Sequence, residues 1–399
     1  MRSAPGHDIE KNLRDAGHFF SRLGKQIDNF WQRVTEGLET QVLWAQFMAE
    51  ARASYSLYTR EVDWGAFQGE TRFRRFLKIA RALFWAMLMK LSPARRVFLL
   101  MALVLAFLGT VQVRSGGPGA HPPTGGSNLF YWLPLAALVF LLALELADRV
   151  TMKRDLEIAR EIQRWLVPEV PPRVPGADVA FVSRPANTVG GDYYDAFLRD
   201  AGNTSEAASR LLLVVADVAG KSVPAALLMA TFQASLRSLA AAPTALTELV
   251  ARINRYACAH SLGGRRFTTA FFAELDPSTR ALTYVRAGHD VPVLRRAGGR
   301  LERLDAGDLP LGIDPGAHYE DHAVTLAPGD LLLIFTDGLV EAVNEKEEEF
   351  GESRLLNALE TTPEQSAEAT LKRLVARVDA FTGAARQRDD ITCLILRAA

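Results

Sequence analysis

The C-terminal part of the chain alternates short apolar runs with turn residues, a pattern typical of β-strands. This pattern predicts strands at 179–185, 193–198, 210–217, 267–275, 281–286, 292–296, 323–326, 331–336 and 391–396. Longer amphipathic stretches predict helices at 223–241, 244–262, 352–360 and 364–382. Short turns between consecutive strands favour antiparallel pairing, and the helices come in pairs instead of alternating with strands. We therefore expect an α+β sandwich with helix pairs packed on the outside.

Two long apolar runs earlier in the chain predict a membrane hairpin. Residues 97–113 and 129–144 carry no charge, and each comes close to the roughly 17 to 25 residues that cross a bilayer. The connection at 114–128 is rich in Gly and Pro, and its only basic residue is Arg114. Because Arg and Lys stand outside both runs, the positive-inside rule places both ends in the cytoplasm. A pair of buried core helices is the alternative.

The other segments of the N-terminal part are also predicted to be helical. Residues 71–91 place apolar side chains at helical spacing behind a basic cluster, which fits an interfacial helix or an ordinary core helix equally well. Residues 145–167 continue the second apolar run as one helix, and prolines end it at 168, 171 and 172. We expect a helical cytoplasmic or interfacial region at 1–96, a transmembrane hairpin at 97–147, a linker or signalling helix at 148–172 and the C-terminal domain at 173–399.

Composition narrows the class of protein. The chain has 399 residues, of which 49% are hydrophobic and 23% charged, as in a folded protein. Its formal net charge is zero, and no zinc-finger spacing or aromatic basic stripe suggests nucleic-acid binding. Cys258 and Cys393 give neither a disulfide framework nor metal-ligand spacing, so we expect a reducing compartment. The first residues lack the features of a secretory signal. A multi-pass protein of the inner cell membrane, with N-terminus and C-terminal domain in the cytoplasm, is expected.

Four aspartates of the C-terminal domain stand where an apolar run meets a turn: Asp192, Asp217, Asp337 and Asp389. A carboxylate at the end of a buried strand is unfavourable unless a cation or hydrogen bonds compensate it. Several converging oxygen ligands suit a hard divalent ion such as Mg²⁺ or Mn²⁺. Each residue taken singly could instead serve a turn or a helix cap. Their repetition predicts a carboxylate-built metal site.

The chemistry of such a site requires no side-chain nucleophile. Two metal ions held by carboxylates can activate a water molecule and stabilise an in-line displacement at phosphorus.

His289 in the string AGHD is a candidate general acid, although a lone His at a turn is more often structural. The Gly220-Lys221-Ser222 string lacks the first glycine of a P-loop, because Val215 stands in its place, and nucleotide binding of that type is excluded.

Taken together, these motifs resemble the SpoIIE/RsbU-like branch of the metal-dependent PPM (PP2C-type) serine/threonine phosphatases. The resemblance covers roughly residues 155–397 and includes the strings NTVGGDYYDAF, VVADVAGKSVPAALLMA, LAPGDLLLIFTDGLVEAVNEKEEEFG and RQRDDITCLIL. It implies a PPM-type α-β-β-α sandwich with a pair of Mn²⁺ or Mg²⁺ ions in a cleft at the sheet edge. Ala219, Ser222 and Asp290 depart from residues common in the family, which puts the geometry of their loops in doubt.

The resemblance also implies roles for particular residues. The implied metal ligands and catalytic residues are Asp192, Asp217 with the Val218 carbonyl, Asp337, and one member of the pair Asp389 and Asp390. Asp217 would bridge the two ions. Asp389 is favoured over Asp390, but the sequence leaves this choice open.

Together with the predicted membrane hairpin, the resemblance implies a membrane-anchored, metal-dependent protein serine/threonine phosphatase. Its substrate would be a phosphorylated cytosolic signalling regulator, such as an anti-sigma-factor antagonist, attacked by a metal-activated water. The linker helix would relay a signal and form a homodimer. A catalytically silent signalling scaffold and a metal-dependent hydrolase of a small phosphoester are the alternatives. The substrate protein and the input signal cannot be read from the sequence.

Overall fold

A computed structural model describes residues 91–114, 129–200, 209–260, 266–362 and 366–399. The chain divides into two compact units, Met1–Leu146 and Ala147–Ala399. The predictions for residues 1–90, including the interfacial helix, lie outside the described residues, as does most of the loop predicted between the two membrane spans. The four-part domain division drawn from the sequence stays a prediction.

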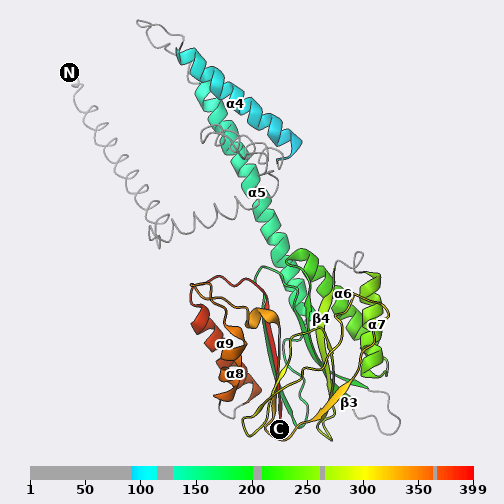
Figure 1. Cartoon of the computed structure of the whole chain (residues 1–399). Coiled ribbons are helices and arrows are strands. Elements are labelled where there is room, and N and C mark those ends of the chain that lie inside the picture. The colour runs from blue at the N-terminus through cyan, green and yellow to red at the C-terminus, as the bar shows by residue number, and fades with distance from the viewer. Residues whose placement is uncertain (1–90, 115–128, 201–208, 261–265, 363–365) are drawn as a thin grey trace, which may run out of the picture. The chain divides into compact units, whose positions relative to one another are not determined.

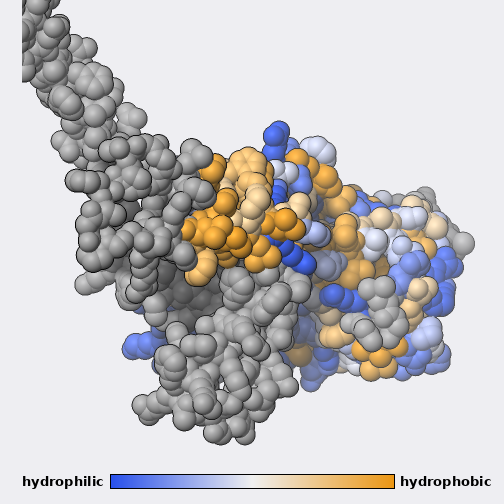
Figure 2. Space-filling model, turned by 90° about the horizontal axis from the view of Figure 1, so that it is seen from above, coloured by the Kyte–Doolittle hydropathy of each residue, from blue (hydrophilic) through white to orange (hydrophobic). Residues whose placement is uncertain are grey.

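Two helices form the described part of the first unit. Helix α4 (Pro93–Arg114) packs against the first part of α5 (Leu129–Leu166) through an edge-to-face contact between Phe98 and Phe140, whose ring centroids are 5.8 Å apart. Many other apolar side chains of these helices are exposed (Figure 2). Both predicted spans are helical, but none of the helices in the described ranges is long and apolar enough to cross a membrane. The prediction of two transmembrane helices is therefore not supported.

Helix α5 continues without interruption to Leu166 and ends before Pro168. The single helix predicted for 145–167 is thus confirmed to within one residue.

Two five-stranded antiparallel sheets form the core of the second unit (Figure 1). The first sheet contains, in spatial order, β1 (Ala177–Arg184), β10 (Ile391–Ala398), β9 (Leu331–Phe335), β6 (Val293–Arg295) and β7 (Leu301–Arg303). The second contains β2 (Tyr193–Asp200), β3 (Ser209–Val218), β4 (Thr268–Leu275), β5 (Ala281–Ala287) and β8 (His322–Thr325). All predicted strands are present, and only β7, which has three residues, was not predicted.

A pair of helices covers the outer face of each sheet (Figure 1). Helices α6 (Val223–Ala240) and α7 (Leu246–Ala259) pack on the second sheet, and α8 (Gly351–Glu360) and α9 (Ala367–Thr382) pack on the first. The order of layers is helix, sheet, sheet, helix. The predicted α+β sandwich is confirmed.

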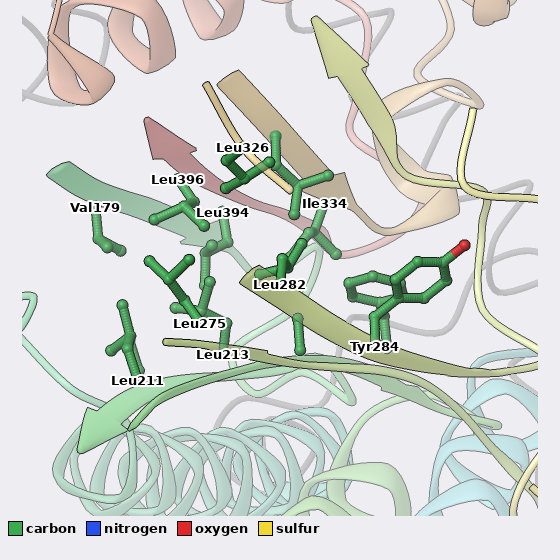
Figure 3. Packing of buried hydrophobic residues seen from close by; sticks show 14 of the residues in the cluster. Val179, Leu211, Leu213, Leu275, Leu282, Tyr284, Leu326, Ile334, Leu394 and Leu396 are labelled. Atoms are coloured by element: carbon green, nitrogen blue, oxygen red, sulfur yellow. The ribbon is translucent and has the colours of Figure 1, made fainter. Parts of the chain in front are cut away.

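Strand β3 shows why the sequence forms these layers. Its residues 211–216 are all apolar and fully buried, because the strand has a core on each face. Leu211, Leu213 and Val215 point into the core between the sheets, where Leu282, Ile334 and Leu394 meet them (Figure 3). The alternate residues 212, 214 and 216 pack under α6 and α7. Successive side chains of a strand point to opposite faces, so a strand that is buried on both faces has an unbroken run of apolar residues in the sequence.

A buried ion pair and a neighbouring hydrogen bond link strand β2, strand β4 and the turn between α6 and α7. The Arg199 side chain on β2 bonds to Glu274 on β4, and both side chains are at most 2% exposed. A second guanidinium nitrogen of Arg199 donates to the carbonyl oxygen of Thr244, in the turn between α6 and α7, at 2.6 Å. Glu274 also lies 3.6 Å from the partly exposed Arg210 of β3.

We expect Glu274→Gln to lower the free energy of unfolding by about 3 to 5 kcal/mol, because it leaves the Arg199 charge buried without its partner. Chemical denaturation of the purified protein measures the change. The matched control is Glu368→Gln, which breaks an exposed ion pair with Lys372 and should leave the free energy of unfolding nearly unchanged. Equal losses in the two variants would contradict the importance of the buried pair.

Candidate active site

The four predicted aspartates all lie at one end of the sandwich. In the second sheet, Asp192 immediately precedes β2 and Asp217 is the next-to-last residue of β3; these strands are antiparallel neighbours. In the first sheet, Asp337 follows the end of β9, and Asp389 stands two positions before β10. Strands β9 and β10 are also antiparallel neighbours. Antiparallel pairing therefore brings the two chain ends of each pair to the same edge.

Asp217 lies at the electrostatic centre of this group. Burial, followed by repulsion from Asp337, Asp389, Asp390 and Asp290, raises the pKa of Asp217 to about 7. Burial and then repulsion from Asp389 also raise the pKa of Asp337, while Lys221 opposes the rise. These couplings show that carboxylates from both sheets share one region. They also show a surplus of negative charge that a cation would neutralise.

Asp192 is the most buried of the four, with 7% of its surface exposed. Burial is the main cause that raises its pKa well above the usual range, and repulsion from Asp217 adds to it. The hydroxyl of Thr336 donates a hydrogen bond of 2.9 Å to Oδ2 of Asp192. Thr336 directly follows β9, so this bond joins the two sheets beside the aspartates.

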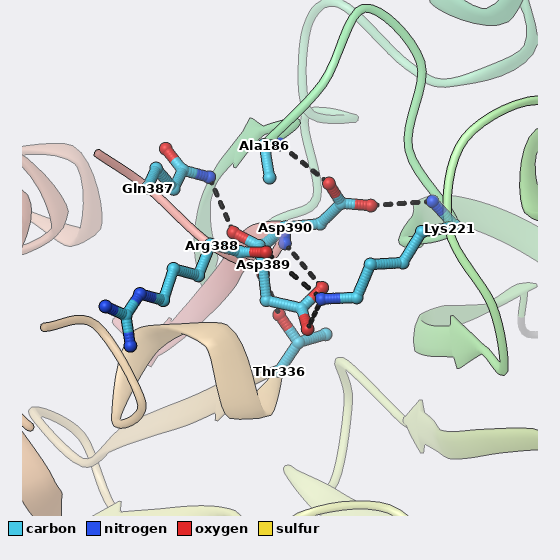
Figure 4. Close-up of polar contacts among 8 residues, drawn as sticks. Ala186, Lys221, Thr336, Gln387, Arg388, Asp389 and Asp390 are labelled. Atoms are coloured by element: carbon cyan, nitrogen blue, oxygen red, sulfur yellow. Dashed lines mark hydrogen bonds and ion pairs between the residues drawn. The ribbon is translucent and has the colours of Figure 1, made fainter. Parts of the chain in front are cut away.

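The neighbouring residues Asp389 and Asp390 have different environments (Figure 4). Both carboxylate oxygens of Asp390 accept hydrogen bonds from backbone amides, those of Ala186 at 2.7 Å and Gly191 at 2.6 Å. Asp389 is 36% exposed, and its Oδ2 accepts a hydrogen bond of 2.8 Å from Nζ of Lys221. Asp390 thus holds the loop before β2, whereas Asp389 faces solvent and the exposed ammonium group of Lys221.

Close backbone approach at this end requires glycine. A Cβ atom on Gly338 would lie 2.0 Å from the carbonyl oxygen of Asp390, and one on Gly191 would lie 2.9 Å from the carbonyl oxygen of Val218. Both glycines stand next to a predicted ligand in the sequence, in VGGD and TDG. Gly338 lets the loops after β9 and before β10 meet in the first sheet, and Gly191 lets the loop before β2 approach the Val218 carbonyl at the end of β3 in the second.

An open cleft of about 470 Å³ adjoins these residues, and Asp217 and Asp337 line it. Asp290 also lines the cleft, where burial and then repulsion from Asp337 raise its pKa to about 6. The sequence showed Asp290 only as a departure from the family pattern, because its nearness to Asp337 depends on the packing of the two sheets. The cleft also contains two arginines: Arg286 donates to three backbone carbonyls, and Arg303 pairs with Glu352.

The C-terminal end of α5 contacts the same loop from the other side. The side-chain amide of Gln163 pairs with the backbone of Gly190, donating from Nε2 to the carbonyl at 2.8 Å and accepting from the amide at 3.2 Å. A second cavity of about 190 Å³ lies here, lined by Gln163, by the buried Asp192 and by the half-buried Asp390. The sequence predicted that this helix would relay a signal but did not identify Gln163.

The donor set has the chemistry of a site for a hard divalent ion, since it consists of carboxylate and carbonyl oxygens with uncompensated negative charge. Within the described ranges, however, no three His, Cys, Asp or Glu side chains are close enough together to hold one ion. The structure therefore gathers Asp192, Asp217, Asp337 and Asp389 around one region but does not show a closed set of ligands. Their metal-binding roles stay predictions.

Known proteins resemble this chain in sequence and in fold. Residues 207–399 match the family model described as stage II sporulation protein E (SpoIIE). The protein IcfG of Synechocystis sp. is 27% identical over 285 residues, which cover 64% of this chain and 43% of IcfG. The phosphoserine phosphatase RsbU of Bacillus subtilis is 28% identical over 195 residues, which cover 49% of this chain and 56% of RsbU. The chain thus spans about half the length of these two relatives.

A solved structure shows the same fold. The SiaA-PP2C domain of Pseudomonas aeruginosa aligns with a TM-score of 0.54 and 22% identity, covering 63% of this chain and 99% of that domain. The family match begins just before β3 and ends with β10, so it includes Asp217, Asp337 and Asp389. By these comparisons, the C-terminal domain of this chain is similar to SpoIIE PP2C-type phosphatase domains.

Proposed function

We propose that this chain is a metal-dependent protein phosphatase that removes phosphate from phosphoserine or phosphothreonine of a signalling protein. The observation that carries the proposal is the gathering of strand-end carboxylates from both sheets beside one open cleft. The relative RsbU, named a phosphoserine phosphatase, supports the reaction type. A phosphorylated regulator such as an anti-sigma-factor antagonist is the substrate class that the family resemblance suggests.

Asp192, Asp217, Asp337 and Asp389 would hold a pair of Mn²⁺ or Mg²⁺ ions, with the Val218 carbonyl as a further oxygen donor. Bound ions of this kind supply an activated water and stabilise charge at phosphorus. Lys221 balances the charge of Asp389. The contacts favour Asp389 over Asp390 as the ligand, because both oxygens of Asp390 already accept backbone hydrogen bonds.

Helix α5 is the proposed route of control. Its last turns carry exposed apolar side chains at helical spacing, Ile158, Ile162 and Trp165, which supports the proposal that two copies pair through this helix. On the other side, Gln163 bonds to Gly190, two residues before Asp192. A rotation of α5 would therefore move the loop that carries a proposed ligand.

A catalytically silent scaffold is the second candidate function. The observation that favours it is that the described residues contain no closed set of three metal-ligating side chains. Binding of Mn²⁺ by the protein separates the two candidates, since a scaffold would not require it.

We expect Asp217→Asn to reduce Mn²⁺-dependent release of phosphate from phosphoproteins by at least about 100-fold, because losing a metal ligand should have a larger effect than losing a group that only orients a ligand. Phosphate release from a phosphoserine peptide measures the rate. The exposed Asp321, changed to Asn, is the control and should leave the rate unchanged. Full activity in the Asp217 variant would refute the assignment. Faster turnover of nucleotides than of phosphopeptides would instead indicate a small-phosphoester hydrolase.

We expect Thr336→Val to weaken Mn²⁺ binding by about 10-fold to 100-fold, because Asp192 loses the hydroxyl that orients it. Calorimetric titration with Mn²⁺ measures the affinity. Thr370→Val is the matched control: Thr370 is also buried, and its hydroxyl has no hydrogen-bond partner among the described residues. Similar affinities in both variants would show that the Thr336 bond does not serve the metal site.

We expect Gln163→Ala to weaken Mn²⁺ binding by up to about tenfold, since the loop before Asp192 loses its anchor on α5. The same titration, together with the midpoint of thermal unfolding, separates this effect from a loss of folding. Glu161→Ala, an exposed change on the same helix, is the control. Unchanged affinity in the Gln163 variant would disconnect α5 from the site.

A further inference from the structure

A buried histidine lies between the two sheets, close to the aspartates. His289 is 2% exposed and follows β5, and together with Thr269 and Phe335 it lines the cleft that contains Asp217 and Asp337. Burial is the main cause that lowers the pKa of His289 to about 3, so the ring is neutral near neutral pH. General acid catalysis by histidine requires the protonated imidazolium, which a ring with this pKa does not form near neutral pH. The residue therefore needs a role other than the general acid that its sequence position suggested.

The ring lies between one strand of each sheet. Nδ1 of His289 lies 3.3 Å from the hydroxyl oxygen of Thr269 on β4. Nε2 is buried and makes no well-aligned hydrogen bond within the described residues, although the backbone of Phe335, the last residue of β9, lies close enough to raise the pKa of the ring. Since Nδ1 already contacts Thr269, we infer that Nε2 carries the proton and faces the backbone of Phe335 without forming a hydrogen bond of ordinary geometry. In that tautomer, Nδ1 accepts the proton of the Thr269 hydroxyl.

Both contacts lead directly to a proposed ligand. Thr269 is the cross-strand partner of Asp217 in the ladder between β3 and β4. Phe335 stands two residues before Asp337 at the end of β9. Asp217 and Asp337 come from different sheets, so no backbone ladder sets the distance between them.

We propose that His289 is a positioning residue, which sets the separation of Asp217 and Asp337 by linking Thr269 to the end of β9. The inference rests on the proposed metal-dependent function. Two neighbours keep the ring in place. Nη1 of Arg286 donates a hydrogen bond of 2.7 Å to the carbonyl of His289. Gly288 adopts a φ of +67°, and a Cβ atom there would lie 2.3 Å from Pro310, so the turn into His289 has little freedom.

The test is calorimetric titration of the full chain and its variants with Mn²⁺ alone. We expect His289→Leu, which keeps an apolar filling of the site, to weaken Mn²⁺ binding by about tenfold. Thr269→Val removes only the hydroxyl and should weaken it by about threefold to tenfold. The double variant should bind no more weakly than His289→Leu alone, because either change breaks the same link. His289→Asn offers an acceptor near the Nδ1 position and should recover part of the affinity.

A stability-matched control separates positioning from general destabilisation. Leu396→Ala removes a buried side chain from the core between the sheets, farther along β10 from the aspartates. It should lower the melting temperature at least as much as His289→Leu while leaving Mn²⁺ affinity unchanged.

Two results would overturn the proposal: wild-type Mn²⁺ affinity in His289→Leu, or fully additive losses in the double variant. If the wild-type protein itself binds no Mn²⁺, the proposed metal-dependent function fails instead.

Discussion

Repulsion among buried carboxylates is the constraint on which this domain depends. Asp217 lies behind six fully buried apolar residues of β3, and four other carboxylates contribute to the rise in its pKa. Charges so placed are unfavourable unless the fold supplies donors or cations. The fold compensates these carboxylates to different degrees. The carboxylate of Asp192 accepts a hydrogen bond from the Thr336 hydroxyl, and that of Asp389 pairs with Lys221. Around Asp217, in contrast, repulsion from other carboxylates dominates. The unmet charge at Asp217 is the strongest physical argument for a cation.

The sandwich concentrates this charge in one place. Each sheet is antiparallel, so the end of one strand and the start of its neighbour share an edge, and two such edges meet at the same end of the core. The apolar core between the sheets maintains their spacing, while Gly191 and Gly338 let neighbouring loops of the same sheet approach each other closely. A side-chain hydrogen bond then crosses between the sheets, from Thr336 to Asp192. The position of the aspartates at this end of the sandwich therefore depends on the packing of the apolar core between the sheets.

The sequence predicted most of this fold because its strands alternate between two apolar cores or lie next to clear turns. The aspartates were also predictable, since a charge directly after an apolar strand is unusual. The roles of Gln163 and Asp290 were not, because they depend on contacts with Gly190 and with Asp337 that no local pattern contains. Apolar runs were the least reliable signal: they predicted helices correctly, but the described helices do not meet the length and hydropathy of a membrane span.

The adjacent residues Asp389 and Asp390 show most clearly what could not be predicted from the sequence alone. Asp389 and Asp390 look equivalent in RQRDDIT, yet their side chains point to different partners. The carboxylate of Asp390 accepts from backbone amides 204 and 199 positions earlier in the chain, so it acts as a structural acceptor that closes the Asp192 loop onto β10. Asp389 has only an exposed lysine at its side-chain oxygen Oδ2, a contact that an incoming cation can replace at little cost. Asp390 thus stabilises the loops of the site, and its neighbour Asp389 remains available to bind a cation.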